Sequence, residues 1–331
     1  TSLRTLHATS LQERPNNNAP MVYTPQNSPS FMLPTPTITQ YRAAIENADT
    51  CFKDLLPIAP TFDAGGQIRL ASGAFAVVFK MYKSDEDRHY AVKCFTQMRA
   101  DRAARYKQIH DYLQAEKSPF WINFRYMESE LWVDAGEGAE YPIVSMPWVE
   151  GITLGEAVRS ACAQGDKAAL HRLLYDFVEL ALRLLALPAA HGDLKHDNIL
   201  VGTDGKLYLV DYDGLFVPAL AGAAPQEAGS PDYQHPSRRA SGAFDRHIDD
   251  FSMGIIALSL YALAQDPSLF AQYHSGQNLI FSHSDFADLL ASAPLRGISL
   301  PACVRTLATR LQSSETYQIL GIATLLYDVQ L

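Results

Sequence analysis

The feature that most constrains this chain is an eleven-residue string in its second half, His191–Val201, which reads HGDLKHDNILV. It places Asp193 and Asn198 directly before an apolar run of the kind that forms a buried strand. Gly202–Lys206 then has the composition of a hairpin turn, and a second apolar run leads to Asp211. A hairpin of this kind predicts that Asn198 and Asp211 lie at the same end of a small sheet.

Asn198 and Asp211 would bring two oxygen ligands together at that end of the sheet. Magnesium prefers carboxylate and phosphate oxygens, so the pair suits a magnesium site. Asp193 would lie beside it, placed to accept a proton from a hydroxyl group. Taken singly, each residue is equally well explained by a turn, because Asp and Asn favour turns. The spacing of the whole set is what indicates a site.

This string resembles the catalytic loop HRDLKxxN and the metal-binding DFG motif of protein kinases. The resemblance implies an α+β, bilobal protein-kinase-like fold, with a small β-rich N-lobe and a helical C-lobe. It implies that Asp193 is the catalytic base and that Lys195 contacts the γ-phosphate of ATP. It also implies that Asn198 and Asp211 hold magnesium.

Strings typical of an ATP site lie in the first half of the chain. Ala71–Val78 (ASGAFAVV) resembles the glycine-rich loop GxGxxGxV, although it keeps one of the three glycines. Tyr90–Lys93 (YAVK) resembles the VAIK strand, whose lysine pairs with the α- and β-phosphates. Ser145–Leu154 (SMPWVEGITL) resembles the hinge, where Val149 would donate its N–H to adenine and Pro147 needs only its carbonyl. The resemblance assigns nucleotide binding to Ala71, Ser72, Gly73, Ala74, Phe75, Ala76, Val78, Ala91, Lys93, Met146, Pro147 and Val149.

Two later strings separate protein kinases from related phosphotransferases. Gly229–Ser237 (GSPDYQHPS) resembles GTPEYxAPE at the end of the activation segment, and Ser230 would there bridge Asp193 and Lys195. Asp249–Gly254 (DDFSMG) resembles DxWSxG, whose Asp braces the catalytic loop from a buried helix. Aminoglycoside and choline phosphotransferases share HGDxxxxNIL, so the catalytic loop alone leaves a small-molecule acceptor open.

The sequence departs from the kinase pattern at the activation segment. Gly192 replaces the Arg of HRD, and Leu215–Gly229 contains no Ser, Thr or Tyr. Because a phosphate there would have neither an acceptor nor that Arg to bind, we expect no switching by phosphorylation of this segment. The metal motif itself reads DYDG, with Asp213 inserted before the glycine.

A second departure concerns the lysine of the YAVK strand, which in kinases pairs with a Glu on the next helix. No Glu occurs between Cys94 and Ala115, and Glu116 lies near the expected helix end. Gln108 lies in about the right turn, and we expect it to make a neutral hydrogen bond to Lys93. The missing acid and the reduced glycine loop leave a third hypothesis open, a pseudokinase that binds nucleotide and acts as a scaffold.

Periodicity and composition predict how the chain is organised. Residues 1–35 are rich in Pro, Asn, Ser and Thr, and we expect a flexible arm. An N-lobe over 36–146 would begin with an amphipathic helix from Ile38 to Phe52, a hinge would span 147–151, and a C-lobe would span 152–331. The further elements that we expect are strands at 67–70, 76–82, 89–95, 122–127 and 141–146, and helices at 100–116, 169–188 and 251–264.

Composition excludes several classes of protein. The chain has 331 residues, a net charge of −9 and a pI of about 5.5, which argues against a nucleic-acid binder. Its four cysteines are scattered without CxxC spacing, which argues against zinc or disulfides and fits a reducing cytoplasm. The longest apolar run is too short to cross a membrane, and we find no secretory signal.

Finer features resemble a bacterial branch of Ser/Thr kinase-like proteins. They are YxxAIxNxxxCF at Tyr41–Phe52, HGDLxHxN, VDYDGxFVPAL and YQHP. That resemblance implies a metal-dependent protein phosphatase and a von Willebrand A-type protein as partners, in systems linked to tellurium resistance. It also implies ATP and magnesium as cofactors and a protein Ser or Thr as acceptor, since Lys195 is usual in Ser/Thr kinases.

Overall fold

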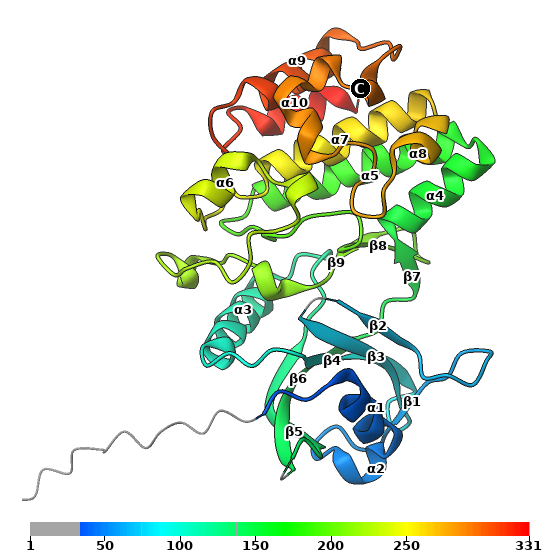
Figure 1. The fold of residues 1–331 in the computed structure, drawn as a ribbon, viewed down its shortest axis with the longest axis vertical. Coiled ribbons are helices and arrows are strands. Elements are labelled where there is room, and N and C mark those ends of the chain that lie inside the picture. Colours follow the sequence, from blue (N-terminus) through cyan, green and yellow to red (C-terminus); the bar gives the residue numbers. More distant parts are fainter. Residues whose placement is uncertain (1–33, 74, 137, 331) are drawn as a thin grey trace, which may run out of the picture. The chain divides into compact units, whose positions relative to one another are not determined.

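The computed structural model describes residues 34–73, 75–136 and 138–330. The expected N-terminal arm, up to residue 33, and Ala74 of the expected glycine-rich loop lie outside the described residues. The remainder forms two lobes, one built on a curled sheet and one built of helices (Figure 1). This α+β, bilobal arrangement agrees with the fold expected from the sequence.

The first lobe is an antiparallel sheet with the order β1-β3-β4-β6-β5. β2 pairs with the start of β3 and β1 with its end, both along the edge of β3 that does not face β4. Its register places Val78 opposite Lys93, so the turn between β2 and β3 lies next to that lysine. The strands are β1 (Ile58–Pro60), β2 (Leu70–Ser72), β3 (Ala76–Lys83), β4 (Arg88–Phe95), β5 (Arg125–Val133) and β6 (Ala139–Pro147).

Two of the predicted strands are displaced. The strand expected at 67–70 begins only at Leu70. The preceding residue, Arg69, donates its N–H to the carbonyl of Thr61 (2.8 Å) and accepts from the N–H of Lys80 in β3 (3.0 Å), so it bonds both to a local hairpin and to the sheet. The strand expected at 122–127 begins at Arg125 and runs to Val133. The N–H of Ile122 donates to a side chain of the helical lobe, so this residue has left the sheet.

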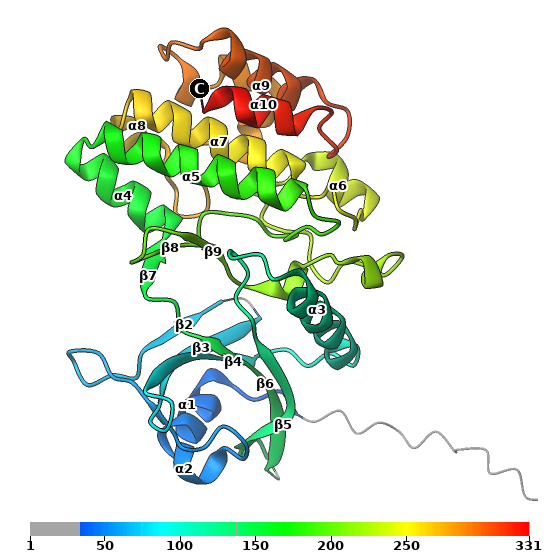
Figure 2. The same ribbon diagram turned by 180° about the vertical axis from the view of Figure 1, so that it is seen from behind.

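The leading helix expected from Ile38 to Phe52 is two helices, α1 (Ile38–Glu46) and α2 (Ala48–Cys51). The break falls at Asn47, whose side-chain amide donates to the carbonyl of Ala43 (2.8 Å) and so competes with the helix backbone. Both helices lie in the hollow of the curled sheet (Figure 2). There the buried Tyr41 donates its hydroxyl to the carbonyl of Phe95 (2.8 Å). The helix α3 (Arg102–Glu116) lies outside the sheet, against β5.

The second lobe is centred on α7, which is buried along almost its whole length, as its apolar sequence predicted. It packs against α5, α9 and α10. The helix α5 ends three residues before Pro188, since proline disfavours helical backbone in the residue before it. The helices are α4 (Leu154–Gln164), α5 (Lys167–Leu185), α6 (Pro236–Ser241), α7 (Asp250–Gln265), α8 (Ser268–Tyr273), α9 (Ala302–Ser313) and α10 (Ile322–Val329). Within the described ranges, no helix has both the length and the apolar character needed to cross a bilayer.

A small sheet, β7 (Gly151–Thr153), β8 (Ile199–Gly202) and β9 (Leu207–Leu209), forms the floor of the helical lobe that faces the first lobe. Just before the β8–β9 hairpin, the carbonyl of Asn198 accepts from the N–H of Val210 (3.0 Å). Asn198 and Asp211 therefore lie at the same end of the hairpin, as the sequence predicted.

Candidate active site

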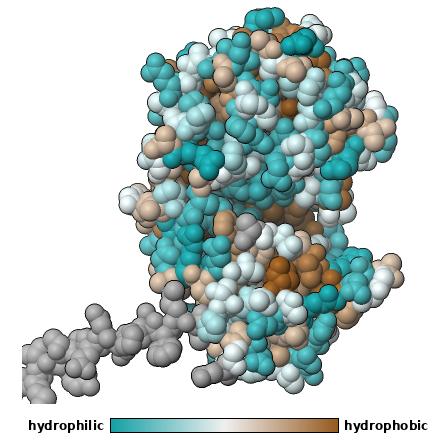
Figure 3. Space-filling view, viewed as in Figure 1, coloured by the Kyte–Doolittle hydropathy of each residue, from teal (hydrophilic) through white to brown (hydrophobic). Residues whose placement is uncertain are grey.

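A cavity of about 470 Å³ lies between the two lobes. In the space-filling view it is part of a hollow across the middle of the molecule, with hydrophobic residues inside it (Figure 3). An apolar cleft with a few polar groups at one end is typical of a small-molecule site. The predicted nucleotide-binding residues that line it are Ala71, Val78, Ala91, Lys93, Met146, Pro147 and Val149.

Of the other predicted nucleotide-binding residues, the four that the structure describes lie at the tip of the β2–β3 hairpin and do not line the cavity: Ser72, Gly73, Phe75 and Ala76. Gly73 donates its N–H to the carbonyl of Ala76 (2.9 Å), and the carbonyl of Phe75 accepts from Thr96 (2.9 Å). Ser72 pairs with Val77 in the sheet. Phe75 exposes its side chain, as expected of an aromatic residue at the tip.

Lys93 of β4 lies at the polar end of the cavity. Its ammonium is 2.6 Å from Asp211 Oδ1 and 2.8 Å from Asp213 Oδ2. Although burial opposes the charge, these carboxylates raise the pKa of Lys93 well above its ordinary value. The prediction that Gln108 is the partner of Lys93 is therefore wrong, since two carboxylates take that place.

The residue of α3 that reaches this end of the cavity is Tyr106, whose hydroxyl donates to Asp213. Its ring stacks on Tyr126 and meets Phe124 edge-on, with centroid distances of 5.3 and 5.4 Å. Gln108 is two residues further along, about 200° around the helix, and so faces away. This geometry explains why the glutamine fails to meet the lysine.

Asp193 lies beside the cavity, close enough to Asp211 for the two charges to interact, and it is held on both of its oxygens. Oδ1 accepts from the backbone N–H of Ser230 (2.7 Å), while Oδ2 accepts from the amide of Asn198 (3.1 Å) and lies 3.1 Å from the ammonium of Lys195. Burial opposes the charge on Lys195, but Asp193 raises the pKa of that ammonium. The bridge expected from Ser230 is thus made to Asp193 alone, through its backbone instead of its hydroxyl.

Asn198 and Asp211 offer the donor set that magnesium prefers. The amide nitrogen of Asn198 donates to the carbonyl of Asp193 (2.8 Å), which leaves the amide oxygen for another partner. Asp211 lines the cavity, and its side chain is 45% exposed. It has φ +69°, a left-handed conformation that aspartate tolerates better than most residues and that is frequent at functional sites. The residues present therefore fit a magnesium ion.

The catalytic-loop backbone is held from behind by Asp249, as the sequence predicted. Its carboxylate accepts from the N–H groups of His191 and Gly192, the latter at 3.0 Å. Arg238, almost wholly buried, donates to the carbonyl of Gly192 (2.7 Å). His191 lies in the core, with Nε2 2.8 Å from the carbonyl of Val210.

Tyr212 stands where the kinase motif has phenylalanine. Its hydroxyl accepts from the N–H of Ile122 (2.8 Å) and lies 2.8 Å from the carbonyl of Leu209. The ring is buried, so these bonds fix the DYDG segment against the loop that enters β5.

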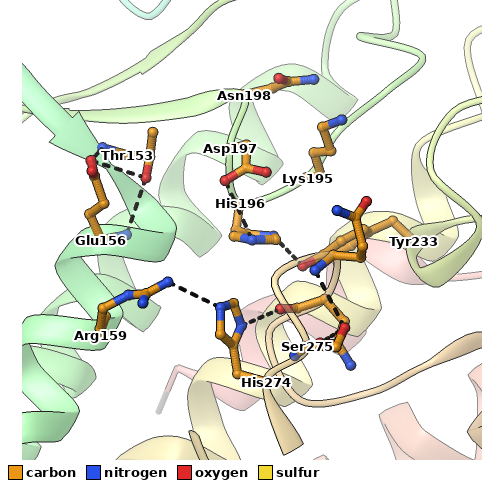
Figure 4. A network of polar contacts seen from close by, with 12 residues as sticks. Thr153, Glu156, Arg159, Lys195, His196, Asp197, Asn198, Tyr233, His274 and Ser275 are labelled. Atoms are coloured by element: carbon orange, nitrogen blue, oxygen red, sulfur yellow. Dashed lines mark hydrogen bonds and ion pairs between the residues drawn. The ribbon is translucent and has the colours of Figure 1, made fainter. Parts of the chain in front are cut away.

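A polar network that was not predicted from the sequence lies behind the catalytic loop (Figure 4). His196 Nδ1 lies 2.5 Å from the hydroxyl of Tyr233, and its ring meets His274 edge-on. His274 is 3.2 Å from Arg159 of α4. Burial lowers the pKa of His196 to about 4, so the ring is neutral near pH 7 and accepts from the phenol. No motif in the sequence connects these residues.

Glu227, also missed, lies at the inner side of the activation segment. A β-carbon built on Gly214 would be 2.6 Å from its Oε1, so the carboxyl group packs against the DYDG turn. Burial, together with Asp193 and Asp211, raises the pKa of Glu227 to about 8. The carboxyl group is therefore mainly protonated near pH 7.

A family model described as the protein kinase domain matches residues 67–282. The chain belongs to the protein kinase family. The matched residues of this chain include Lys93, the whole catalytic loop, the DYDG segment and Asp249.

Curated relatives of this chain are distant. It is 26% identical over 202 residues to a cAMP-dependent protein kinase catalytic subunit of Arthrobotrys oligospora, covering 60% of this chain and 37% of that protein. It is 24% identical over 242 residues to serine/threonine-protein kinase 17A of Oryctolagus cuniculus, covering 70% of this chain and 56% of that protein. With serine/threonine-protein kinase PAK 1 of Mus musculus it shares 28% over 155 residues, 45% of this chain and 26% of that protein. The matches thus span between about a quarter and about half of the length of these relatives.

Proposed function

We propose that this chain is a protein serine/threonine kinase, which transfers the γ-phosphate of ATP to a protein hydroxyl with magnesium. One observation carries the proposal. Asp193, held by Asn198 and the Ser230 backbone, lies close to Asp211, which shares the polar end of an apolar cleft with Lys93. A proton acceptor, a cation and oxygen ligands thus lie close together beside one cleft, as phosphoryl transfer requires.

Each residue has a distinct part in the proposed reaction. Met146, Pro147 and Val149 would enclose the adenine ring, and the ammonium of Lys93 would bind phosphate oxygens of ATP. Asn198 and Asp211 would hold magnesium, which neutralises phosphate charge when bound.

Beside the cleft, Asp193 would orient the acceptor hydroxyl and take its proton. Lys195 would stabilise negative charge on the γ-phosphate as it is transferred. The Lys195 ammonium lies 3.1 Å from Asp193 Oδ2, which supports the proposal that both residues act on the same reacting groups.

A protein acceptor is favoured over a small one by the segment after DYDG. Gly229–Ser237 resembles the kinase strip that shapes a peptide site, and Ser230 contacts Asp193 directly. The named Ser/Thr kinases among the relatives point the same way. A metal-dependent phosphatase and a von Willebrand A-type protein as partners, a bacterial origin in tellurium-resistance systems and a cytoplasmic location remain parts of the proposal that rest on sequence resemblance.

The acceptor class is tested by competition. The purified protein is given γ-labelled ATP, magnesium and a generic protein substrate, with and without an excess of choline and an aminoglycoside. We expect label on protein Ser and Thr that the small acceptors do not reduce. Label transferred to a small acceptor instead would favour a small-molecule phosphotransferase, and nucleotide binding without transfer would favour a scaffold.

A matched pair of variants accompanies this assay. Asp193→Asn is expected to abolish transfer, whereas Asp204→Asn, the same change on the exposed β8–β9 turn, is expected to preserve it. Equal activity in both variants would contradict the role proposed for Asp193.

A further inference from the structure

We propose that Asp213 is the acid that positions Lys93 for phosphate binding, in place of a carboxylate on α3. The inference rests on the proposed function, because it takes the cleft to be a nucleotide site. Asp213 is a positioning residue: it acts through the lysine and does not itself touch the phosphates.

The acids of α3 are engaged elsewhere. Asp111 is exposed and pairs with Lys107 one turn away (2.7 Å). Glu116, at the helix end, accepts from the hydroxyl of Ser118 (2.7 Å). Neither is within hydrogen-bonding reach of Lys93, whose two carboxylate partners both come from the DYDG segment.

The two carboxylates on Lys93 differ in their surroundings. The Asp211 side chain is 45% exposed and lines the cavity, whereas the Asp213 side chain is 15% exposed. Asp211 is therefore accessible to a cation in the cleft, and once engaged there it can no longer serve the lysine alone. Asp213 is withdrawn from the cavity and can remain on the lysine throughout.

Tyr106 fixes the second oxygen of Asp213. The phenol donates to Oδ1, which leaves Oδ2 to the ammonium at 2.8 Å. The ring is 3% exposed and packed by Phe95, Phe124 and Tyr126, so it has little freedom to move. The helix α3 is thus connected to Lys93 by two hydrogen bonds, one from the Tyr106 phenol to Asp213 and one from the Lys93 ammonium to Asp213.

The test compares two ligands that differ in their phosphates. Binding of ADP and of adenosine is measured by calorimetry in EDTA, so that no metal contributes. For Asp213→Asn we expect ADP affinity to fall roughly tenfold or more, the loss of one charge-assisted hydrogen bond, with adenosine affinity unchanged. Tyr106→Phe, which keeps the ring, should lower ADP affinity by a smaller factor of about three. Asp204→Asn is the matched control and should bind both ligands as the wild type does.

Three results would overturn the inference: wild-type ADP affinity in Asp213→Asn, an equal loss for adenosine, or a wild type that binds ADP no better than adenosine. An equal loss would mean that the substitution distorts the whole cleft. In the transfer assay, the KM for ATP of Asp213→Asn should rise by the factor found for ADP, with a smaller change in kcat. If ADP affinity depends on Asp213 as expected but the wild type phosphorylates nothing, the proposed kinase activity is contradicted and this inference stands.

Discussion

A β-carbon built on Gly192 would lie 2.7 Å from the carbonyl carbon of Gly214. Gly192 also has φ +83°, a conformation that other residues rarely adopt. The catalytic loop and the DYDG turn therefore meet backbone to backbone, and only glycine fits at position 192. This contact accounts for the missing Arg of HRD, because no side chain can project from this position without displacing the metal motif.

Substituting Gly192 tests this contact. Gly192→Ala should lower the free energy of unfolding by about 2 kcal/mol more than Gly205→Ala does, since overpacking adds to the strain of positive φ. Gly205 is the matched control, with φ +79° and no atom within 4 Å of a built β-carbon. Urea unfolding measures both. Equal losses would show that conformational strain alone matters at position 192.

The brace from Asp249 gives a second prediction. Asp249→Asn keeps the shape but turns one acceptor oxygen into a donor, which faces a backbone N–H of His191 or Gly192. We expect a loss of about 1–3 kcal/mol in the free energy of unfolding, the cost of a buried unpaired donor. Transfer activity should also fall, because the catalytic loop loses its support. An Asn variant with full stability and full activity would contradict the brace.

Asp250 predicts how stability depends on pH. Burial raises the pKa of Asp250 to about 7, and its only backbone donor is the N–H of Ile319 (3.1 Å) among the described residues. Because the folded carboxyl binds its proton more tightly than the unfolded one, its contribution to stability is complete below about pH 4 and is lost as the pH rises through 7.

Asp250→Asn removes this titration and keeps an acceptor for Ile319. Relative to the wild type, the variant should gain stability between pH 4 and 8, by on the order of a few kcal/mol. Urea unfolding at pH 4, 6 and 8 measures the difference. Parallel pH profiles for the two proteins would contradict the raised pKa.

From the composition of the activation segment we predict that the transfer rate does not depend on phosphorylation of this segment. Residues 215–229 contain no Ser, Thr or Tyr, and Gly192 leaves no cation at the HRD position to bind a phosphate. Treating the protein with a broad-specificity phosphatase should leave its transfer rate within about twofold, where a switched kinase changes by orders of magnitude. A tenfold loss would reveal a phosphorylated switch elsewhere in the chain.

The catalytic side of the site was predictable because its residues lie close together in the sequence. Asn198 and Asp211 flank one hairpin, and its turn and apolar runs are visible without a structure. Asp249 was predictable from a motif in a helix whose apolar sequence already marked it as buried.

The partner of Lys93 was not predicted, because it depends on packing between segments more than a hundred residues apart. Two signals were present: an acid missing from α3 and an extra acid, Asp213, in the metal motif. The sequence alone does not connect the missing acid with the extra one, because the connection depends on where α3 packs. The predicted start of β5 was wrong for a similar reason, because the N–H of Ile122 donates to the hydroxyl of Tyr212 and not to a neighbouring strand.

The most direct test of the account is transfer of γ-phosphate from labelled ATP to protein Ser or Thr, measured for the wild type, Asp193→Asn and Asp211→Asn. Calorimetry with ADP in EDTA runs beside it to show that each protein still binds nucleotide. We predict incorporation by the wild type that depends on magnesium, and a loss of about 10²–10⁴-fold in Asp193→Asn with ADP binding intact. Incorporation at the wild-type rate by Asp193→Asn, or none by a wild type that binds ADP, would contradict a catalytic role for this cleft.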